Sequence, residues 1–220
     1  MESIYESRET LLAGINNRAI SGCLVRNIDL NHSDLSDHAF DRISFKQIGL
    51  AGAKLAHSAL QNINFNAASM RGASLERAEL KTVNFFNSEL IETTFAMSTM
   101  TRCRFFETTL MNARFNGARI VSSSFQSSDL YGAKFAGAFL LNCEFSDPQL
   151  GNASLSNVDF SNAVLIDVDL QGANLYGANF SDAVLIKVDL RDSNMVNVNL
   201  AGARLISVNH ERADLAPSNR

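Results

Sequence analysis

The protein is a chain of 220 residues, 46% of them hydrophobic, with a formal net charge of −4 at pH 7. This length corresponds to a single domain, and the mildly acidic, well-mixed charge argues against direct nucleic-acid binding, which requires a basic stripe. No segment approaches the roughly 18 apolar residues of a membrane-spanning helix, and the opening sequence MESIYESRET lacks the apolar core of a signal peptide. We therefore expect a cytoplasmic protein that does not contact membranes.

Residues 1–17 lack the pattern that governs the rest of the chain, so they are predicted to form an N-terminal cap segment. The stretch SRETLLAG predicts one or two turns of helix, with Ser7 near the N-cap and Gly14 as the stop. The expected role of this helix is to cover the exposed backbone and core edge of the repeats that follow.

A five-residue period begins after the cap. Every fifth residue is apolar from Ile20 to Leu205, and the residue two positions earlier is nearly always small, except at Arg18, His38 and Pro148. This period matches neither the 3.6-residue period of a helix nor the two-residue period of a strand, so it predicts a repeat architecture. One large and one small inward residue per unit predict a narrow, close-packed interior. Pro148 is expected to form a small bulge or kink, because it cannot donate a backbone hydrogen bond.

A 20-residue period lies above the short one. Residues 161–170 (SNAVLIDVDL) and 181–190 (SDAVLIKVDL) are identical at eight of ten positions, and phenylalanines recur every 20 residues from Phe45 to Phe145. Four pentapeptides per coil would stack each residue over the one 20 positions later. No run of Gly, Ser or Pro interrupts the pattern, so we expect an unbroken register without projecting loops.

The units GAKF at 132–135, GANL at 172–175 and GANF at 177–180 resemble the pentapeptide-repeat motif, A-(D/N)-L-x-x. The resemblance covers about residues 16–215 and implies an all-β fold: a right-handed quadrilateral β-helix of about ten coils. The expected organisation is a cap at 1–17, a β-helix at 18–215 and a tail at 216–220. Nothing in the tail can cap the last coil, and family members often dimerise through their C-terminal coils. A homodimer formed by these coils is therefore expected.

The search for chemistry gives no catalytic constellation. The sequence contains no P-loop, GxSxG, HExxH or CxxC pattern, so we expect no enzyme, cofactor or metal site. Four histidines share no column from coil to coil, and His210 replaces a core leucine near the C-terminus: His32, His38, His57 and His210. Three cysteines fall in the small inward column of one face, too far apart for a disulfide, and are expected to be buried thiols: Cys23, Cys103 and Cys143.

Two outward apolar patches are predicted from the register. A mid-rod patch, expected to bind a partner, consists of Phe86, Phe106, Ile91, Met111 and Tyr131. A C-terminal patch, expected to form a lateral or dimer interface, consists of Val164, Ile166, Val184, Ile186 and Ile206. Contiguous exposed apolar area usually marks an interface, whereas isolated surface apolar residues are normal and β-branched ladders also favour strands. The 20-residue period further predicts one acidic outward column: Asp29, Glu89, Asp129, Asp169 and Asp189.

Three functions compete at this point. The leading hypothesis is a rod-shaped protein-binding scaffold, because a repeat rod offers long flat surfaces. The resemblance also implies an alternative, since quinolone-resistance and mycobacterial-type members imitate duplex DNA and engage DNA gyrase or topoisomerase IV. The weak net charge and the expected lack of loops depart from that group. A further alternative is an accessory protein of type VI secretion, because the leader RETLLAGI at 8–15 loosely resembles leaders found with such genes.

Overall fold

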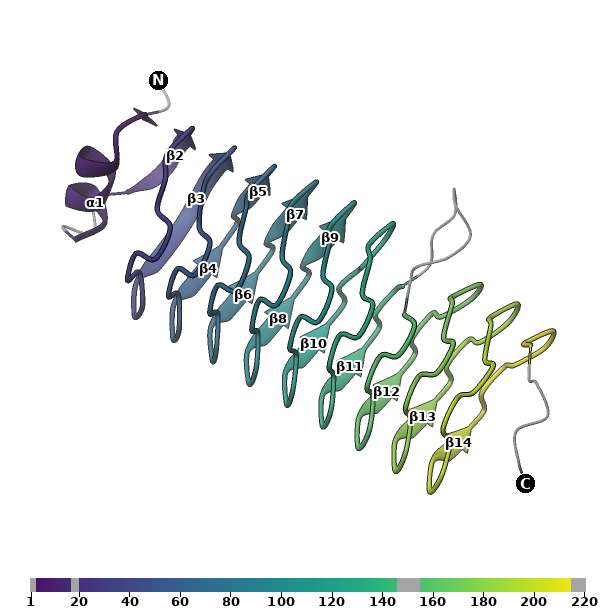
Figure 1. Ribbon diagram of the computed structural model, residues 1–220. Coiled ribbons are helices and arrows are strands. Elements are labelled where there is room, and N and C mark those ends of the chain that lie inside the picture. Colours follow the sequence, from purple (N-terminus) through teal and green to yellow (C-terminus); the bar gives the residue numbers. More distant parts are fainter. Residues whose placement is uncertain (1–2, 17–19, 146–154, 215–220) are drawn as a thin grey trace.

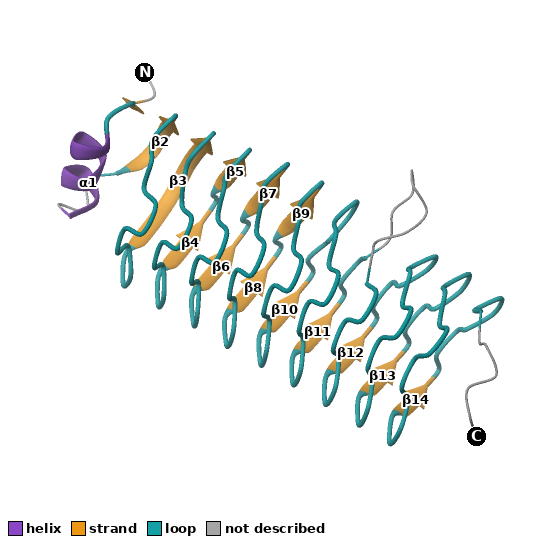
Figure 2. Cartoon of the chain, in the orientation of Figure 1, coloured by secondary structure: helices purple, strands orange, loops and turns teal. Residues whose placement is uncertain are grey.

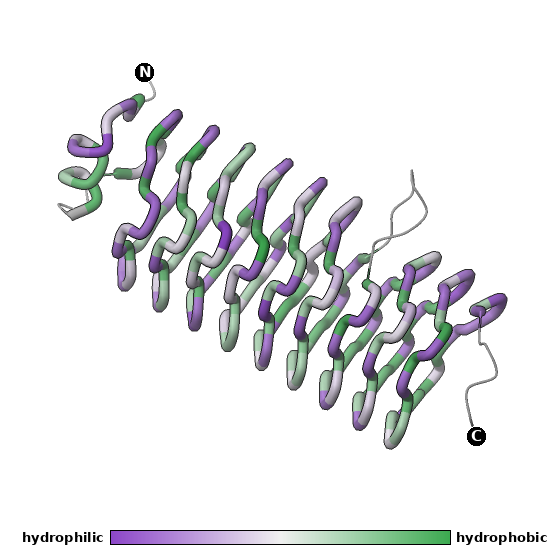
Figure 3. The backbone as a smooth tube through the Cα atoms, viewed as in Figure 1, coloured by the Kyte–Doolittle hydropathy of each residue, from purple (hydrophilic) through white to green (hydrophobic). Residues whose placement is uncertain are grey.

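The computed structural model describes residues 3–16, 20–145 and 155–214. The chain winds into a β-solenoid of about ten turns, with the N-terminal helix at one end of the rod and the last described coil at the other (Figure 1). The predicted all-β coil of four pentapeptides is confirmed. Hydrophilic and hydrophobic positions alternate along each coil, because inward and outward side chains alternate (Figure 3).

The N-terminal end carries a strand that the sequence analysis missed. β1 (Ser3–Tyr5) pairs in parallel with the first strand of the solenoid, so that Tyr5 lies over Val25. α1 (Arg8–Asn16) follows and is the helix shown at the N-terminal end in Figure 2. Ser7 caps it as predicted, since the Leu11 amide donates to the Ser7 carbonyl at 3.1 Å and the Thr10 amide donates to the Ser7 hydroxyl at 3.4 Å. Leu11 and Ile15 bury the first coil.

Gly14 does not end the helix, contrary to the prediction. α1 continues to Asn16, and a Cβ at Gly14 would lie 2.6 Å from Ile20 Cγ2 and 3.3 Å from the Tyr5 hydroxyl. A glycine at this position therefore allows the helix to approach the solenoid closely. A glycine near the end of a helix is equally consistent with a helix stop and with a close approach of the helix backbone to its neighbour, so the local sequence could not distinguish the two.

Short parallel strands line two adjacent sides of the rod. One side carries β4 (Ala59–Gln61), β6 (Glu79–Lys81), β8 (Thr99–Thr101), β10 (Arg119–Val121), β11 (Phe139–Leu141), β12 (Val164–Ile166), β13 (Val184–Ile186) and β14 (Arg204–Ile206). The next side carries β5 (Asn64–Asn66), β7 (Asn84–Phe86) and β9 (Arg104–Phe106). The long strand β3 (Ala39–Lys46) spans both sides and pairs with β2 (Ser21–Arg26). Isolated bridges such as Glu89–Thr109 and Thr94–Arg114 stack the remaining two sides.

A left-handed residue forms the corner of every described pentapeptide. The second residue after each large inward side chain has a φ between 47° and 70°, as at Asn87 (47°) and Gly202 (70°). Glycine, asparagine and aspartate tolerate this conformation best, which explains why these types recur at the corner. The turn redirects the chain once per pentapeptide, and four such turns close one coil.

The core is filled by two ladders of phenylalanine rings on opposite sides of the coil. The first ladder consists of Phe45, Phe65, Phe85, Phe105, Phe125 and Phe145, and the second of Phe95, Phe115, Phe135, Phe160 and Phe180. Neighbouring rings within a ladder stack with centroids 4.5–5.1 Å apart. The two ladders meet edge to face at 5.8–6.3 Å. Both arrangements are favoured by the ring quadrupole.

The predicted unbroken register is wrong. Ile120 pairs with Leu140 and Leu165 pairs with Leu185, both 20 positions apart, but Leu140 pairs with Leu165, 25 positions later. One coil is therefore one pentapeptide longer than the others. Because Glu144 already pairs across this longer spacing, with Asp169, the extra residues fall within 146–154, outside the described residues. Pro148 lies in the same range.

The remaining inward irregularities are as follows. The three cysteines are buried thiols that form no disulfide with one another, as predicted. His38 is half-buried and contacts the Ser36 carbonyl through Nδ1 at 2.6 Å, beside the ring of Phe40. His210 is exposed, as are most residues of the last described coil. Burial raises the pKa of the Cys103 and Cys143 thiols to about 11, which keeps both protonated at neutral pH.

Candidate partner-binding surface

An exposed aromatic pair lies outside the filled core at mid-rod. Phe86 and Phe106 are the last residues of β7 and β9, and their rings stack with centroids 5.5 Å apart and an interplanar angle of 5°. Phe86 is 43% exposed and Phe106 is 37% exposed. The inward neighbours Phe85 and Phe105 anchor the backbone beneath, so the register fixes the position of the outward rings. Two large rings held rigidly at the surface form a preorganised apolar contact.

The other three residues of the mid-rod patch form a separate column. Ile91, Met111 and Tyr131 stack on successive coils, because the Glu92 amide donates to the Met111 carbonyl and the Asn112 amide to the Tyr131 carbonyl. The corner residues Asn87 and Glu107 and the polar column of Glu89 and Thr109 lie between this column and the phenylalanine pair. The predicted patch is thus two patches on adjacent sides. We call them the Phe86/Phe106 pair and the Tyr131 column.

The C-terminal patch is longer than the sequence analysis predicted. The longer coil places Leu141 beside Ile166, so one outward aliphatic ladder runs through five strands: Val121, Leu141, Ile166, Ile186 and Ile206. The parallel column contains Phe139, Val164 and Val184, with the Arg119 guanidinium carbon 4.6 Å from the Phe139 ring centroid. Most of these side chains are half-buried by their neighbours in the ladder, and Ile206 at its end is 42% exposed.

The core itself opens at the C-terminal coil. Leu205 occupies the inward position of β14 and is nevertheless 49% exposed, whereas its counterpart Leu185 one coil earlier is fully buried. Leu200 and Val208 are only partly buried against the core. No described element covers these inward apolar side chains, whereas Leu11 and Ile15 of α1 cover the first coil at the N-terminal end.

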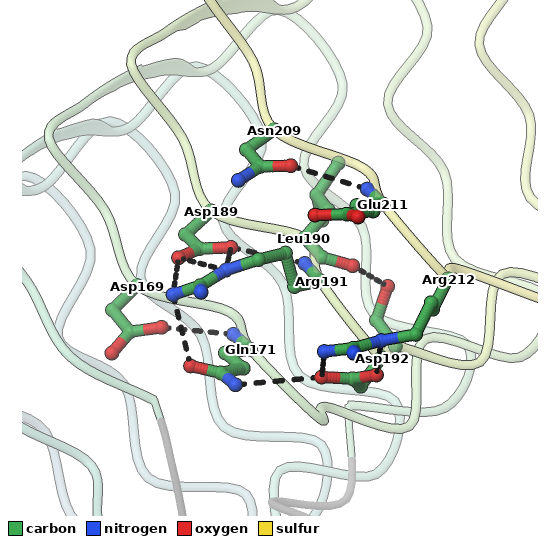
Figure 4. Close-up of polar contacts among 10 residues, drawn as sticks. Asp169, Gln171, Asp189, Leu190, Arg191, Asp192, Asn209, Glu211 and Arg212 are labelled. Carbon is green, nitrogen blue, oxygen red and sulfur yellow. Dashed lines mark hydrogen bonds and ion pairs between the residues drawn. The ribbon is translucent and has the colours of Figure 1, made fainter.

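Charged side chains on the C-terminal coils form a network (Figure 4). The Arg191 guanidinium donates hydrogen bonds to both carboxylate oxygens of Asp189 at 2.6–2.9 Å, and the Arg212 guanidinium donates to both oxygens of Asp192 at 2.7–2.9 Å. Gln171 joins the two pairs, since its amide oxygen accepts from Arg191 at 3.2 Å and its amide nitrogen donates to Asp192 at 3.5 Å. Hydrogen bonding from the arginines lowers the pKa of Asp189 and of Asp192 below the ordinary value.

The predicted single acidic column is wrong because of the longer coil. Asp29, Glu89 and Asp129 share one column, in which Thr109 bridges to both Glu89 and Asp129. Asp169 and Asp189 instead continue the column of Glu144 on the neighbouring side. The longer coil thus gathers Glu144, Asp169 and Asp189 in one column. Residues 144–214 contain ten acidic and four basic residues, a net charge of −6, whereas residues 71–134 carry a net charge of +2.

Two shallow grooves adjoin the Phe86/Phe106 pair. One, of about 520 Å³, is lined by Asn84, Phe85, Phe86, Arg104, Phe106, Ser124, Gln126 and Glu144. The other, of about 420 Å³, is lined by Thr82, Asn84, Arg102, Arg104, Ser122, Ser123, Ser124, Asn142 and Glu144. Four residues line both grooves, so the two are continuous. In the part of the chain that the structure describes, no three His, Cys, Asp or Glu side chains gather in a way that could hold a metal ion.

Comparison with known protein families matches the sequence to "Pentapeptide repeats", with eight copies over residues 50–87, 123–162, 143–182 and 183–216. These segments cover more than half of the chain. The chain belongs to the pentapeptide-repeat family. The family assignment agrees with the observed solenoid and with the motif on which the resemblance was based.

Solved structures of other pentapeptide-repeat proteins share the fold. Full-length QnrB1, described as a plasmid-mediated fluoroquinolone resistance protein, is 18% identical, with 84% of this chain and 92% of that chain covered and a TM-score of 0.50. HetL, a pentapeptide-repeat protein involved in heterocyst differentiation regulation in the cyanobacterium Nostoc sp., is 18% identical, with 93% and 95% covered and a TM-score of 0.41. No curated protein matches the sequence. None of the described helices of this pentapeptide-repeat protein is long and apolar enough to span a membrane.

Proposed function

We propose that this pentapeptide-repeat protein is a non-enzymatic, rod-shaped scaffold that binds a protein partner in the cytoplasm. The observation that carries the proposal is the Phe86/Phe106 pair. Two parallel, stacked aromatic rings are held at the surface although the inward positions already fill the core. Aromatic residues are enriched in the buried centres of protein interfaces, and neither ring is needed to complete the interior.

The test is capture from a host lysate with the immobilised protein, followed by mass spectrometry, beside the double variant Phe86→Asp/Phe106→Asp. Both side chains point outward, so the variant is expected to remain folded. The Tyr131→Asp variant on the adjacent side is the matched control, because Tyr131 is exposed to a similar degree, 44%. A partner that is retained by the control and lost by the double variant supports the proposal. Partners captured equally by all three proteins contradict it.

A second candidate function is supported by the charge distribution. With a net charge of −6 over residues 144–214, the C-terminal coils present an acidic rod segment, and the column of Glu144, Asp169 and Asp189 lies along one side. A DNA-mimicking protein that binds DNA gyrase or topoisomerase IV would need such a surface. The net charge of the whole chain is weak because basic residues at mid-rod offset part of the negative charge of this C-terminal segment.

The assay for this candidate is DNA supercoiling by purified gyrase in the presence of a fluoroquinolone. Recovery of supercoiling on addition of the protein, reduced in the Glu144→Gln/Asp169→Asn variant, would favour DNA mimicry over the scaffold. Unchanged inhibition at every protein concentration would remove topoisomerase protection from consideration.

We further propose that two copies associate through their C-terminal coils. The exposed inward residue Leu205 and the end of the aliphatic ladder at Ile206 adjoin each other in β14 and would be covered together. Light scattering after gel filtration tests this point. A dimer that dissociates in the Leu205→Asp variant is expected, while a monomeric wild-type protein would contradict the proposal.

A further inference from the structure

The polar half of the mid-rod groove carries two arginines that form no ion pair with any carboxylate in the described part of the chain. Arg102 stands at a corner of the coil and Arg104 is the first residue of β9, and both line the groove of about 420 Å³. Neither side chain makes a hydrogen bond or an ion pair with any residue that the structure describes. Six other arginines do pair with a carboxylate: Arg26, Arg42, Arg71, Arg77, Arg191 and Arg212.

One carboxylate lines the groove beside the two arginines. Glu144 accepts a hydrogen bond from Gln126 Nε2 at 2.8 Å and keeps its negative charge, so the lining has one excess positive charge. Glu107 follows Phe106 at the next corner, past the end of β9 opposite to Arg104, and does not line either groove. The remaining lining side chains are hydroxyls and amides, which can donate hydrogen bonds to an anionic group.

The cationic and aromatic halves are joined on a single strand. Arg104 and Phe106 flank the inward residue Phe105, so both point outward from β9. Their Cα atoms are two residues apart, about 6.8 Å at the usual rise of a strand. An extended peptide presents alternate side chains on one face at the same spacing. An acidic residue two positions from an apolar residue would therefore meet Arg104 and Phe106 together.

We infer that this groove binds an extended, acidic segment of a partner protein, with an apolar side chain against Phe86 and Phe106 and a carboxylate at Arg102 and Arg104. This inference rests on the proposed scaffold function and specifies the chemistry of the partner. A nucleic acid is the less suitable anion. The two exposed rings stack against each other and offer mainly their edges, whereas unpaired bases stack on open aromatic faces.

The first experiment pans a phage library of random peptides against the wild-type protein and against the Arg102→Gln/Arg104→Gln variant. Peptides enriched on the wild type should carry Asp or Glu two positions from Phe, Leu or Ile, and the variant should lose this enrichment. The matched control is Arg114→Gln, since Arg114 is also exposed and is on another side of the rod. Enrichment that is independent of acidic residues, or that persists in the double variant, overturns the inference.

The second experiment measures fluorescence polarisation with a labelled peptide of repeated Glu-Ser-Phe units and its Gln-Ser-Phe counterpart. The wild-type protein is expected to prefer the acidic peptide by about tenfold in Kd, as for a single lost charge pair at an interface, and the double variant should bind both equally. A labelled single-stranded oligonucleotide is the third probe. Tighter binding of the oligonucleotide than of the acidic peptide overturns the inference.

The two proposals can fail separately. A lysate partner that depends on Phe86 and Phe106 but is captured equally by the Arg102→Gln/Arg104→Gln variant would leave the scaffold function standing and overturn the acidic-segment inference. If no captured partner depends on Phe86 and Phe106, both the scaffold function and the acidic-segment inference are overturned. Circular dichroism of each variant confirms that the exposed substitutions leave the solenoid folded.

Discussion

The phenylalanine ladders lead to a quantitative prediction about the core. Phe105 is fully buried and contacts four other rings: it stacks on Phe85 and Phe125 at 4.8 and 4.7 Å and meets Phe95 and Phe115 edge to face at 5.9 and 6.2 Å. Phe180 is equally buried, but its ring pairs with Phe160 alone. Replacing either residue by leucine removes a similar volume and leaves an apolar side chain, so the transfer and cavity costs should be comparable.

The difference between the two variants isolates the ring–ring contacts. Each aromatic pair contributes about 0.5–1.5 kcal/mol beyond its buried area, and Phe105 has three more such pairs than Phe180. Because contacts within one cluster are not additive, we expect Phe105→Leu to lower the free energy of unfolding by about 1–3 kcal/mol more than Phe180→Leu.

Urea unfolding followed by circular dichroism measures this difference. The m-value serves as the check, since a stack of repeats can lose cooperativity and unfold in parts. Equal destabilisation by the two substitutions, at unchanged m-value, would refute the reasoning. The rings would then act only as space-filling side chains, and the regular stacking would be a consequence of the coil geometry.

Three further predictions follow from the buried and surface groups. Native Cys103 and Cys143 should react with a thiol reagent at pH 8 only after addition of denaturant, because their thiol pKa of about 11 leaves little thiolate; rapid reaction of the native protein would contradict their burial. Hydrogen bonding from Arg191 lowers the pKa of Asp189 in the folded protein, so this carboxylate contributes stability that is present above its ordinary pKa of 3.8 and is lost as the pH falls through the lower folded value. Asp189→Asn should therefore reduce the loss of stability on acidification below that ordinary pKa, and an unchanged pH profile would count against the arginine pairing. Ile166→Asp/Ile186→Asp should leave the circular dichroism spectrum intact but weaken self-association in light scattering; a dimer of unchanged strength would exclude the aliphatic ladder from the interface.

The pentapeptide pattern predicted the interior of this fold almost completely. Both inward columns and the buried cysteines follow from which residue of each unit faces inward, because close packing requires the same inward positions in every unit. Ser7 as the N-cap was also predictable, because its signal is local. β1 was not predictable, because its pairing with β2 depends on the solenoid that follows.

The candidate surfaces were predicted residue by residue but not as assemblies. Phe86 and Phe106 were correctly placed together, since their contact depends only on adjacent coils within an unbroken register. The unpaired arginines of the groove were missed. An arginine is identified as unpaired only when its neighbours on its own coil and on the two adjacent coils are known. Arg102 lies at a corner and Arg104 in a strand, so the 20-residue period assigns them to different columns and does not bring them together.

The longer coil shows why a five-residue pattern cannot by itself fix a solenoid surface. An insertion of one whole pentapeptide leaves every inward position apolar, so the five-residue period does not reveal it. The 20-residue period does reveal it. Phenylalanines stop following Phe145 at 20-residue steps and resume at Phe160 and Phe180, which continue the other ladder from Phe135. The spacing of the phenylalanines thus indicates how many residues each coil contains, because a ring stacks best on another ring. The same shift places Asp169 and Asp189 in the column of Glu144 and lengthens the aliphatic ladder, so the side chains that each side of the rod presents depend on where that single pentapeptide is inserted.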